Sequence, residues 1–257
     1  MKPFTKTLLV DADIVAFQAA ARNETWTDFG RDVGELWVAH ADMDSMIRRW
    51  LKMFKADTAV MALSCREHNF RKDVLPTYKD NRKGSEDRRP DLLTDCKAYL
   101  AEAYESVLWY GLEGDDVLGI LHTHPSRAYG ETIVISEDKD LRTVEGPLYA
   151  PHRDEVGLID ITKLEADQFL CWQTLVGDST DGYGGCKGIG KASPYALEVL
   201  EADADELWDI VVEGYASKGF TEEDAIVQIR CAKILTAEHY DTETKEIHLW
   251  TPADLLT

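Results

Sequence analysis

Short apolar runs alternate with amphipathic stretches over the first 160 residues. Four runs are short and apolar enough to predict buried strands: TLLVDAD (7–13), TAVMALS (58–64), VLWYGLEGDD (107–116) and TIVISEDKD (132–140). Helical periodicity fills the stretches between and after them, at 11–22, 39–54, 90–105 and 115–124. Because strands that alternate with helices form parallel sheets, this order predicts an α/β fold with a mostly parallel central sheet flanked by helices.

The pattern changes near residue 160, where helical periodicity becomes continuous. Amphipathic segments follow one another at 161–177, 193–202, 203–217 and 221–237, with one short strand-like run, EIHLW (246–250). We therefore expect two parts, an α/β core over residues 1–160 and a helical lobe over residues 161–257.

Three of the four predicted strands end in acidic residues, and so does a glycine-rich stretch in the lobe. The acids are Asp11, Asp13, Glu113, Asp115, Asp116, Asp138, Asp140, Asp178 and Asp181. Open α/β sheets bind ligands at the carboxyl ends of their strands, so these side chains are expected to converge. Converging carboxylates repel one another unless cations neutralise them, and hard oxygen ligands favour Mg²⁺ or Mn²⁺. The alternative interpretation is helix capping, which also places acids at helix N-termini.

Positive charge gathers in FRKDVLPTYKDNRK (70–83), which carries a local net charge of +3. An aromatic residue among lysines and arginines is typical of a base stack with phosphate contacts. The candidate nucleic-acid contacts here are Arg71, Lys72, Tyr78, Lys79, Arg82 and Lys83. Since the segment leaves the carboxyl end of a predicted strand, we expect it to overhang the acids. Taken alone, the segment is also typical of a solvated loop.

The stretch VGDSTDGYGGCKGIGKAS (176–193) joins two aspartates to a run of glycines and lysines. Glycine turns and helix N-termini bind phosphate through backbone N–H groups. The candidate phosphate contacts are Lys187, Gly188, Gly190, Lys191 and Ser193, at the start of the predicted helix. This stretch therefore combines candidate metal ligands with a candidate phosphate-binding turn.

Composition limits the partners that such a site would take. The chain has 257 residues and a net charge of −20, so most of its surface repels phosphate. A general polyanion binder is excluded, but a nucleic-acid substrate held by local cations is not. Five widely spaced cysteines and the lack of a long apolar run predict reduced thiols, no membrane span and a cytoplasmic protein. Nothing requires a dimer, so we expect a monomer.

In order and spacing, the charged and glycine-rich stretches resemble the 5′ nuclease family, which includes flap endonucleases, the 5′ nuclease domain of bacterial DNA polymerase I and bacteriophage 5′→3′ exonucleases. The matching stretches are LLVDAD, FRKDVLPTYKDNRK, LEGDDVLGIL, ISEDKDL and VGDSTDGYGGCKGIGKAS. Together they cover about three-quarters of the chain, and its compact size is most like that of the phage members. The resemblance implies a PIN-like core with a basic arch segment at about 66–92 and a helix-three-turn-helix element at about 176–201.

The resemblance also implies two-metal-ion hydrolysis of DNA, at a free 5′ end, nick or flap, with an RNA–DNA hybrid as a further option. In this interpretation Asp11, Glu113 and Asp115 bind the first ion. Asp116, Asp138, Asp140, Asp178 and Asp181 bind or support the second. Lys79 and Arg82 act on the scissile phosphate, and the helix-three-turn-helix element holds the duplex backbone, with potassium as an optional ion.

The family pattern is not matched everywhere. It places an aspartate five or six positions before the Phe-Arg of the basic segment, where this chain has Ser64 and Cys65. Asp13 is a candidate substitute. The departure leaves an alternative interpretation open: a protein with this fold that binds DNA structures but does not cleave them. A third alternative, a haloacid-dehalogenase-type phosphatase with Asp11 as nucleophile, accounts for VDADIV but not for the basic and glycine-rich stretches.

Overall fold

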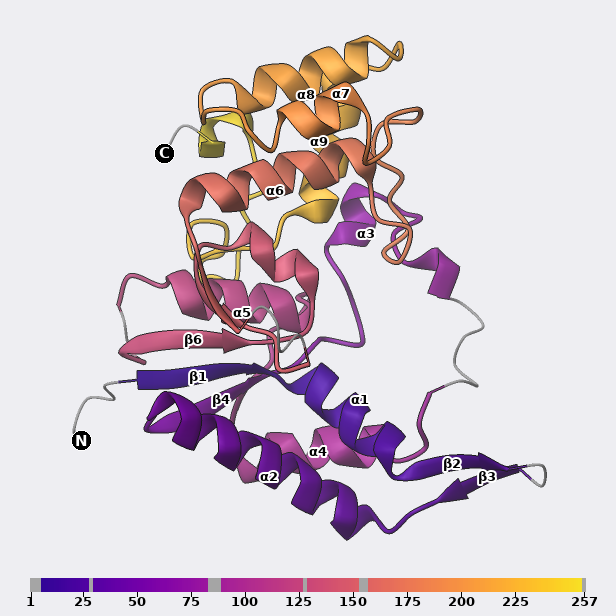
Figure 1. Ribbon diagram of the computed structural model, residues 1–257, viewed down its shortest axis with the longest axis vertical. Helices are drawn as coiled ribbons and strands as arrows, with labels where there is room; N and C mark the ends of the chain where they lie inside the picture. The colour runs from indigo at the N-terminus through magenta and orange to yellow at the C-terminus, as the bar shows by residue number, and fades with distance from the viewer. Residues whose placement is uncertain (1–5, 28–29, 83–88, 127–128, 153–156, 256–257) are drawn as a thin grey trace. The chain divides into compact units, whose positions relative to one another are not determined.

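The computed structural model describes residues 6–27, 30–82, 89–126, 129–152 and 157–255. The chain divides into two compact units (Figure 1). The first unit comprises residues 1–68, 84–138 and 147–159, and the second comprises residues 69–83, 139–146 and 160–257. A single boundary near residue 160 is therefore incomplete, because two earlier segments belong to the helical unit.

The first unit is built around a six-stranded sheet with the strand order β5-β4-β1-β6-β7-β8 (Figure 1). The strands are β1 (Lys6–Asp11), β4 (Thr58–Ala62), β5 (Glu105–Val107), β6 (Glu131–Ile135), β7 (Gly146–Tyr149) and β8 (Leu158–Ile161). Central β1 pairs in parallel with β4 and with β6, and the pairs β4–β5 and β6–β7 are parallel as well. The predicted, mostly parallel sheet is confirmed.

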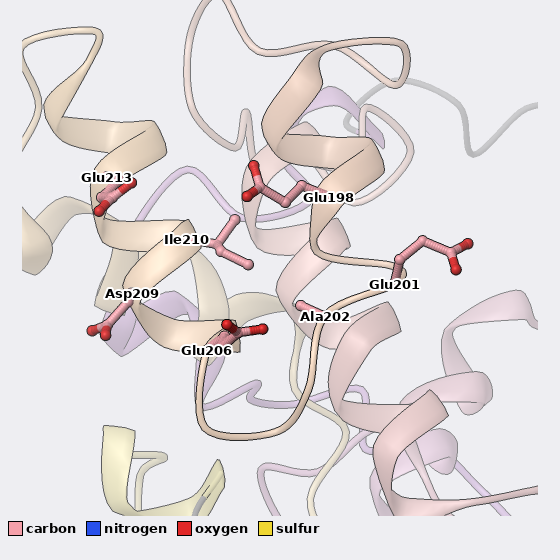
Figure 2. A pocket seen from close by; sticks show the side chains of 7 residues that line it. All are labelled: Glu198, Glu201, Ala202, Glu206, Asp209, Ile210 and Glu213. Atoms are coloured by element: carbon pink, nitrogen blue, oxygen red, sulfur yellow. The ribbon is translucent and has the colours of Figure 1, made fainter.

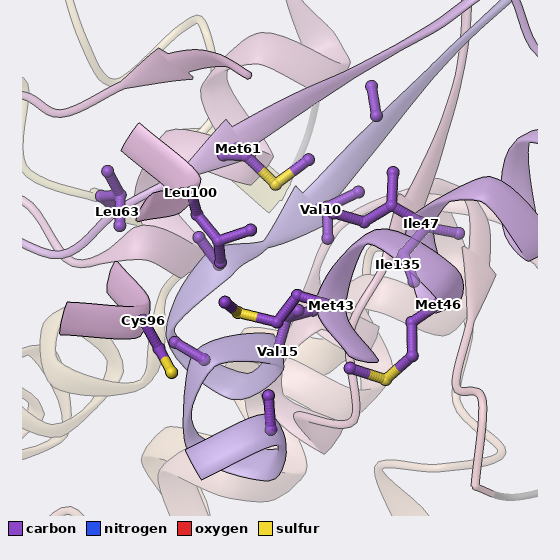
Figure 3. Packing of buried hydrophobic residues seen from close by; sticks show 14 of the residues in the cluster. Val10, Val15, Met43, Met46, Ile47, Met61, Leu63, Cys96, Leu100 and Ile135 are labelled. Atoms are coloured by element: carbon purple, nitrogen blue, oxygen red, sulfur yellow. The ribbon is translucent and has the colours of Figure 1, made fainter. Parts of the chain in front are cut away.

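Helices cover both faces of this sheet (Figure 1). One face carries α1 (Ala12–Arg22), α2 (Leu36–Phe54) and α4 (Leu93–Ala103), and the other carries α5 (Gly114–Thr123). Figure 3 shows Met43 and Ile47 of α2 packed with Leu100 of α4 against Val10 and Met61 of the strands. Full burial of such a side chain stabilises the fold by about 1.5–3 kcal/mol. This core fixes the carboxyl end of β1, where the first acids lie.

Two elements differ from the sequence prediction. A two-stranded antiparallel hairpin, β2 (Glu24–Thr27) and β3 (Gly30–Val33), was not predicted. The strand expected over 107–116 is wrong beyond Val107, where β5 ends. Leu108 and Tyr110 are 54% and 67% exposed, so the apolar pattern there marks surface residues and not a buried strand.

The second unit is mainly helical, with its own apolar core. Its main helices are α6 (Lys163–Val176), α7 (Pro194–Glu198), α8 (Leu207–Ala216) and α9 (Glu222–Ala232). Shorter turns are α3 (Arg71–Val74), η1 (Asp80–Arg82), η3 (Lys139–Thr143) and η4 (Pro252–Leu255). Capping boxes begin α6 at Thr162 and α9 at Thr221. The strand expected at 246–250 is reduced to a bridge between Tyr240 and Ile247.

The five cysteines are free thiols, of which Cys65 is partly exposed and the other four are buried. None of the helices described here combines the length and the apolar character that a bilayer crossing needs.

Candidate active site

Asp11 is the innermost acid of the first unit. It ends β1 and caps α1, since its Oδ1 accepts a hydrogen bond from the Ile14 N–H at 3.1 Å. Its Oδ2 accepts a bond of 2.8 Å from the hydroxyl of Ser136. Burial, followed by the charges of Asp13 and Asp138, raises the pKa of Asp11 to about 7. The carboxylates are therefore crowded enough for an added cation to stabilise them.

Ser136 links the ends of two neighbouring strands. It follows β6, its hydroxyl donates to Asp11, and its oxygen accepts a 3.0 Å bond from the Asp138 N–H. Since β1 and β6 pair in parallel, Asp11 and Asp138 lie at the same edge of the sheet. Asp13, in the first turn of α1, has an ion pair of 2.7 Å with Lys97 of α4.

The acids at the start of α5 form a helix cap. Glu113 is the N-cap residue, and it exchanges side-chain and backbone hydrogen bonds with buried Asp116 in a capping box. Asp115 lies in the first turn. The hydroxyl of Ser64 accepts a 2.8 Å bond from the Gly114 N–H, so a serine at one of the two positions expected for the aspartate holds this helix start. The capping interpretation is thus confirmed for Asp11, Glu113 and Asp116, alongside any role in metal binding.

Two acids of the second unit converge on one cationic group. The Lys139 ammonium contacts Asp140 Oδ1 at 2.8 Å and also contacts Asp178 Oδ2. Gln173 of α6 also donates to Asp140 Oδ1, at 2.6 Å, so two side chains hold that oxygen. Burial alone would raise the pKa of Asp178, but hydrogen bonds from Lys139 and the Thr180 N–H outweigh it and lower that pKa. The Lys139 ammonium therefore occupies a point that the carboxylates of both Asp140 and Asp178 face.

Asp181 anchors the basic segment. Its Oδ2 accepts from the Tyr78 hydroxyl at 2.8 Å and pairs with the Lys79 ammonium at 3.4 Å. Its Oδ1 pairs with the Arg82 guanidinium at 2.5 Å, and its carbonyl accepts from the Lys79 N–H at 2.8 Å. Lys79 adopts a left-handed backbone conformation (φ 57°), which is unusual for a residue other than glycine. These contacts hold Lys79 and Arg82 in one place.

Two predicted nucleic-acid contacts need correction. Arg71 and Tyr78 are only 3% and 1% exposed, so neither offers a surface to DNA. Arg71 donates to the carbonyl oxygens of Cys231 and Lys233, and Tyr78 packs in the core of the second unit. Lys72 remains exposed and lies 3.9 Å from Asp80. Lys83 lies outside the described residues.

The glycine-rich stretch forms a series of turns between α6 and α7. Four of the predicted phosphate contacts are exposed there: Lys187, Gly188, Gly190 and Lys191. The fifth, Ser193, is the N-cap of α7, and its hydroxyl accepts from the Ala196 N–H at 3.3 Å. Its side chain therefore has a structural role, while the other four remain candidates for phosphate contact.

Further along the second unit, α7 and α8 border a strongly acidic hollow of about 430 Å³. Figure 2 shows the glutamates and the aspartate around it, with two apolar side chains: Glu198, Glu201, Ala202, Glu206, Asp209, Ile210 and Glu213. Such a concentration of carboxylates repels a phosphate backbone. DNA contact is therefore expected elsewhere on the second unit.

The nine predicted metal ligands are divided between the units. Asp11, Asp13, Glu113, Asp115, Asp116 and Asp138 belong to the first, and Asp140, Asp178 and Asp181 belong to the second. Over the part of the chain that the structure describes, no three His, Cys, Asp or Glu side chains form a group that could hold a metal ion. The donors are nonetheless carboxylate oxygens, crowded around Asp11 and paired with an ammonium at Asp140 and Asp178, which suits hard divalent ions.

Sequence reasoning missed the residues that orient these acids. Ser136 and Ser64 carry no signal beyond lying next to a strand end, and Gln173 lies in the middle of an ordinary amphipathic helix. Lys139 stands between Asp138 and Asp140 in the sequence, and this charge alternation was the one signal available.

Known proteins resemble this chain in sequence and in fold. Residues 6–148 match the family model described as 5′-3′ exonuclease, N-terminal resolvase-like domain. The chain is 30% identical to the exodeoxyribonuclease of Enterobacteria phage T3, over 95% of this chain and 92% of the relative. Its fold is similar to the T5 D15 protein co-crystallised with metal ions (TM-score 0.67, 17% identity, 89% of each chain). It is also similar to the bacteriophage T5 D15 flap endonuclease in complex with DNA and metal ions (TM-score 0.60, 18% identity, 88% of this chain and 90% of the other).

Proposed function

Since the chain belongs to the 5′-3′ exonuclease family, whose members hydrolyse phosphodiester bonds, we propose that it is a metal-dependent nuclease acting on DNA at free 5′ ends, nicks or flaps. The observation that carries this proposal is the link from buried Asp11 through the Ser136 hydroxyl to the Asp138 N–H, at the carboxyl edge of the parallel sheet. Because the chain belongs to this family, we abandon the alternative interpretation in which Asp11 is the nucleophile of a phosphatase.

Two divalent ions, Mg²⁺ or Mn²⁺, fit the oxygen donors of this chain. We assign Asp11, Glu113 and Asp115 to the first ion and Asp140 and Asp178 to the second, with Asp116, Asp138 and Asp181 in support. When bound, such ions lower the pKa of a water nucleophile and stabilise the leaving oxygen. The assignment is supported by Lys139, whose ammonium marks the point where Asp140 and Asp178 already accept a cation.

The basic segment orients the phosphate. Asp181 pairs with both Lys79 and Arg82, so their positive charges lie close together. Their positive charge would stabilise the charge that develops on the phosphate oxygens in the transition state. Asp181 is thus a positioning residue for the basic segment as well as a candidate ligand.

The turns between α6 and α7 would hold duplex DNA. Exposed Lys187 and Lys191 supply positive charge, and the exposed Gly188 and Gly190 have no side chain to keep a phosphate from the backbone. These groups contact phosphate but carry no base-reading chemistry, so binding here is independent of sequence. We assign a helix-three-turn-helix function to residues 176–201, with potassium as an optional ion.

Product mapping tests this proposal. Flapped, nicked and blunt DNA, labelled separately at the 5′ and 3′ ends, would be incubated with protein and Mg²⁺. We expect products that shorten from the 5′ end or are cut at the flap junction. Cleavage that proceeds from the 3′ end would contradict the proposal, and tight binding without cleavage would identify a non-catalytic member of the family.

Replacing Lys79 by alanine is expected to lower the single-turnover cleavage rate by about 10- to 100-fold, because a cation next to the phosphate is lost. DNA affinity, measured by anisotropy with Ca²⁺, should change less than about threefold. Lys79→Arg should retain most of the rate. Lys72→Ala, in the same segment, should weaken binding with little change in rate. An unchanged rate in Lys79→Ala would remove this residue from the mechanism.

A further inference from the structure

The first unit contains a second feature beside the acids, a pocket of about 450 Å³. It lies beyond the carboxyl end of β4 and is walled by α4 and by the stretch that follows β5. The volume falls in the range of about 300–1,000 Å³ that small-molecule sites occupy. No residue of this pocket was a predicted site residue except Asp13.

Most of its lining is apolar, with one ring at the rim. Leu63 is a buried apolar residue of the lining, while Ala98, Ala101, Leu108 and Tyr110 are exposed. The Tyr110 ring stacks on His68, with centroids 5.6 Å apart and planes 18° apart. A flat aromatic surface, held in place by a second ring, is therefore available at the pocket mouth.

The charges of the pocket cancel. Lys97 pairs with Asp13 at 2.7 Å, and the lining contains one further cation and one further anion, Arg66 and Glu67. A phosphate or another ion gains little electrostatic free energy in a lining whose positive and negative charges are equal in number. The hydroxyl of Thr94 adds a neutral hydrogen-bonding group. The lining suits a flat, neutral group with polar edges, which describes a nucleobase.

The pocket also opens next to the candidate active site. It includes Asp13, from the first turn after Asp11, and Ser64, which holds the start of α5 through Gly114. A base bound there belongs to a nucleotide near the reacting phosphate. Bases in a duplex are stacked and paired, so only an unpaired one is able to enter.

We propose that this pocket binds the base of an unpaired nucleotide of the DNA substrate by stacking on Tyr110. The proposal rests on the proposed nuclease function and names the part of the substrate that the site recognises beyond the phosphate. Stacking of one base on an aromatic side chain is worth about 1–3 kcal/mol, or roughly 5- to 150-fold in affinity.

Affinity measurements test the stacking. Duplexes ending in one unpaired 5′ nucleotide, either normal or abasic, would be titrated in Ca²⁺ with wild type, Tyr110→Ala and Tyr110→Phe. We expect wild type and Tyr110→Phe to prefer the normal nucleotide by about tenfold, and Tyr110→Ala to lose that preference. Trp37→Ala, which removes another exposed aromatic residue of the first unit, should keep it.

A thiol probe gives a second readout in the unaltered protein. Cys65 lines the pocket and is the partly exposed cysteine, while the other four are buried. The normal nucleotide should protect Cys65 from alkylation, and the abasic one should not. Equal affinity for both DNAs in wild type, or equal protection, would overturn the pocket assignment while leaving nuclease activity intact. Absence of any DNA binding would overturn both proposals.

Discussion

Replacing Asp178 by asparagine should lower the cleavage rate by about 10³-fold or more, because a neutral amide no longer helps to hold a divalent ion. The fold should survive, since Asn retains the Oδ1 acceptor that bonds the N–H groups of Thr180 and Asp181. Lys139 keeps Asp140 as a partner and is partly exposed, so the loss of unfolding free energy should stay below about 1 kcal/mol.

The matched control for Asp178 is Asp209→Asn. Asp209 lies exposed on α8 in the same unit, at the acidic hollow in Figure 2. The same chemical change there should leave both cleavage and Ca²⁺-supported DNA binding within about twofold of wild type. Cleavage by Asp178→Asn within tenfold of wild type would contradict the assignment of Asp178 as a metal ligand.

Replacing Gly185 by alanine should destabilise the protein by about 3–5 kcal/mol. Gly185 has a left-handed backbone (φ +60°), and an added Cβ would lie 2.3 Å from the Gly177 nitrogen and 2.7 Å from the Leu175 oxygen. Both contacts are with backbone atoms, so the loop that carries Asp178 and Asp181 must move. Cleavage should therefore fall together with stability.

The matched control for Gly185 is its neighbour. A Cβ added at Gly184 meets nothing within 4 Å, and Gly184 is not among the glycines with positive φ. In thermal denaturation, Gly185→Ala should unfold roughly 10 °C below wild type, while Gly184→Ala should unfold within about 2 °C of it. Equal melting temperatures for the two variants would show that the turn between α6 and α7 is not packed as described.

The parts of the fold that the sequence predicted well are those with local patterns. The buried strands β1, β4 and β6 are short apolar runs, because a parallel strand is covered on both faces, and acids follow β1 and β6. The same rule failed at Leu108 and Tyr110, where an apolar run continues on the surface beside a pocket. Periodicity does not distinguish a buried apolar residue from an exposed one that lines a pocket.

The residues that position the site depend on contacts between distant parts of the chain. Tyr78 was expected to stack on a base, yet it bonds Asp181, more than 100 residues away. Arg71 likewise meets carbonyl groups about 160 residues later. Charge and residue type suggested DNA contacts in both cases, and only burial in the folded unit shows that these side chains hold the segment in place.

The most direct test of the metal-dependent mechanism is the single-turnover cleavage rate of 5′-flapped DNA as a function of Mg²⁺ concentration, beginning from protein stripped with EDTA. We expect no cleavage in EDTA and full recovery on adding Mg²⁺, with a rate that rises more steeply than first order because two ions are needed. Cleavage that continues unchanged in EDTA would contradict it.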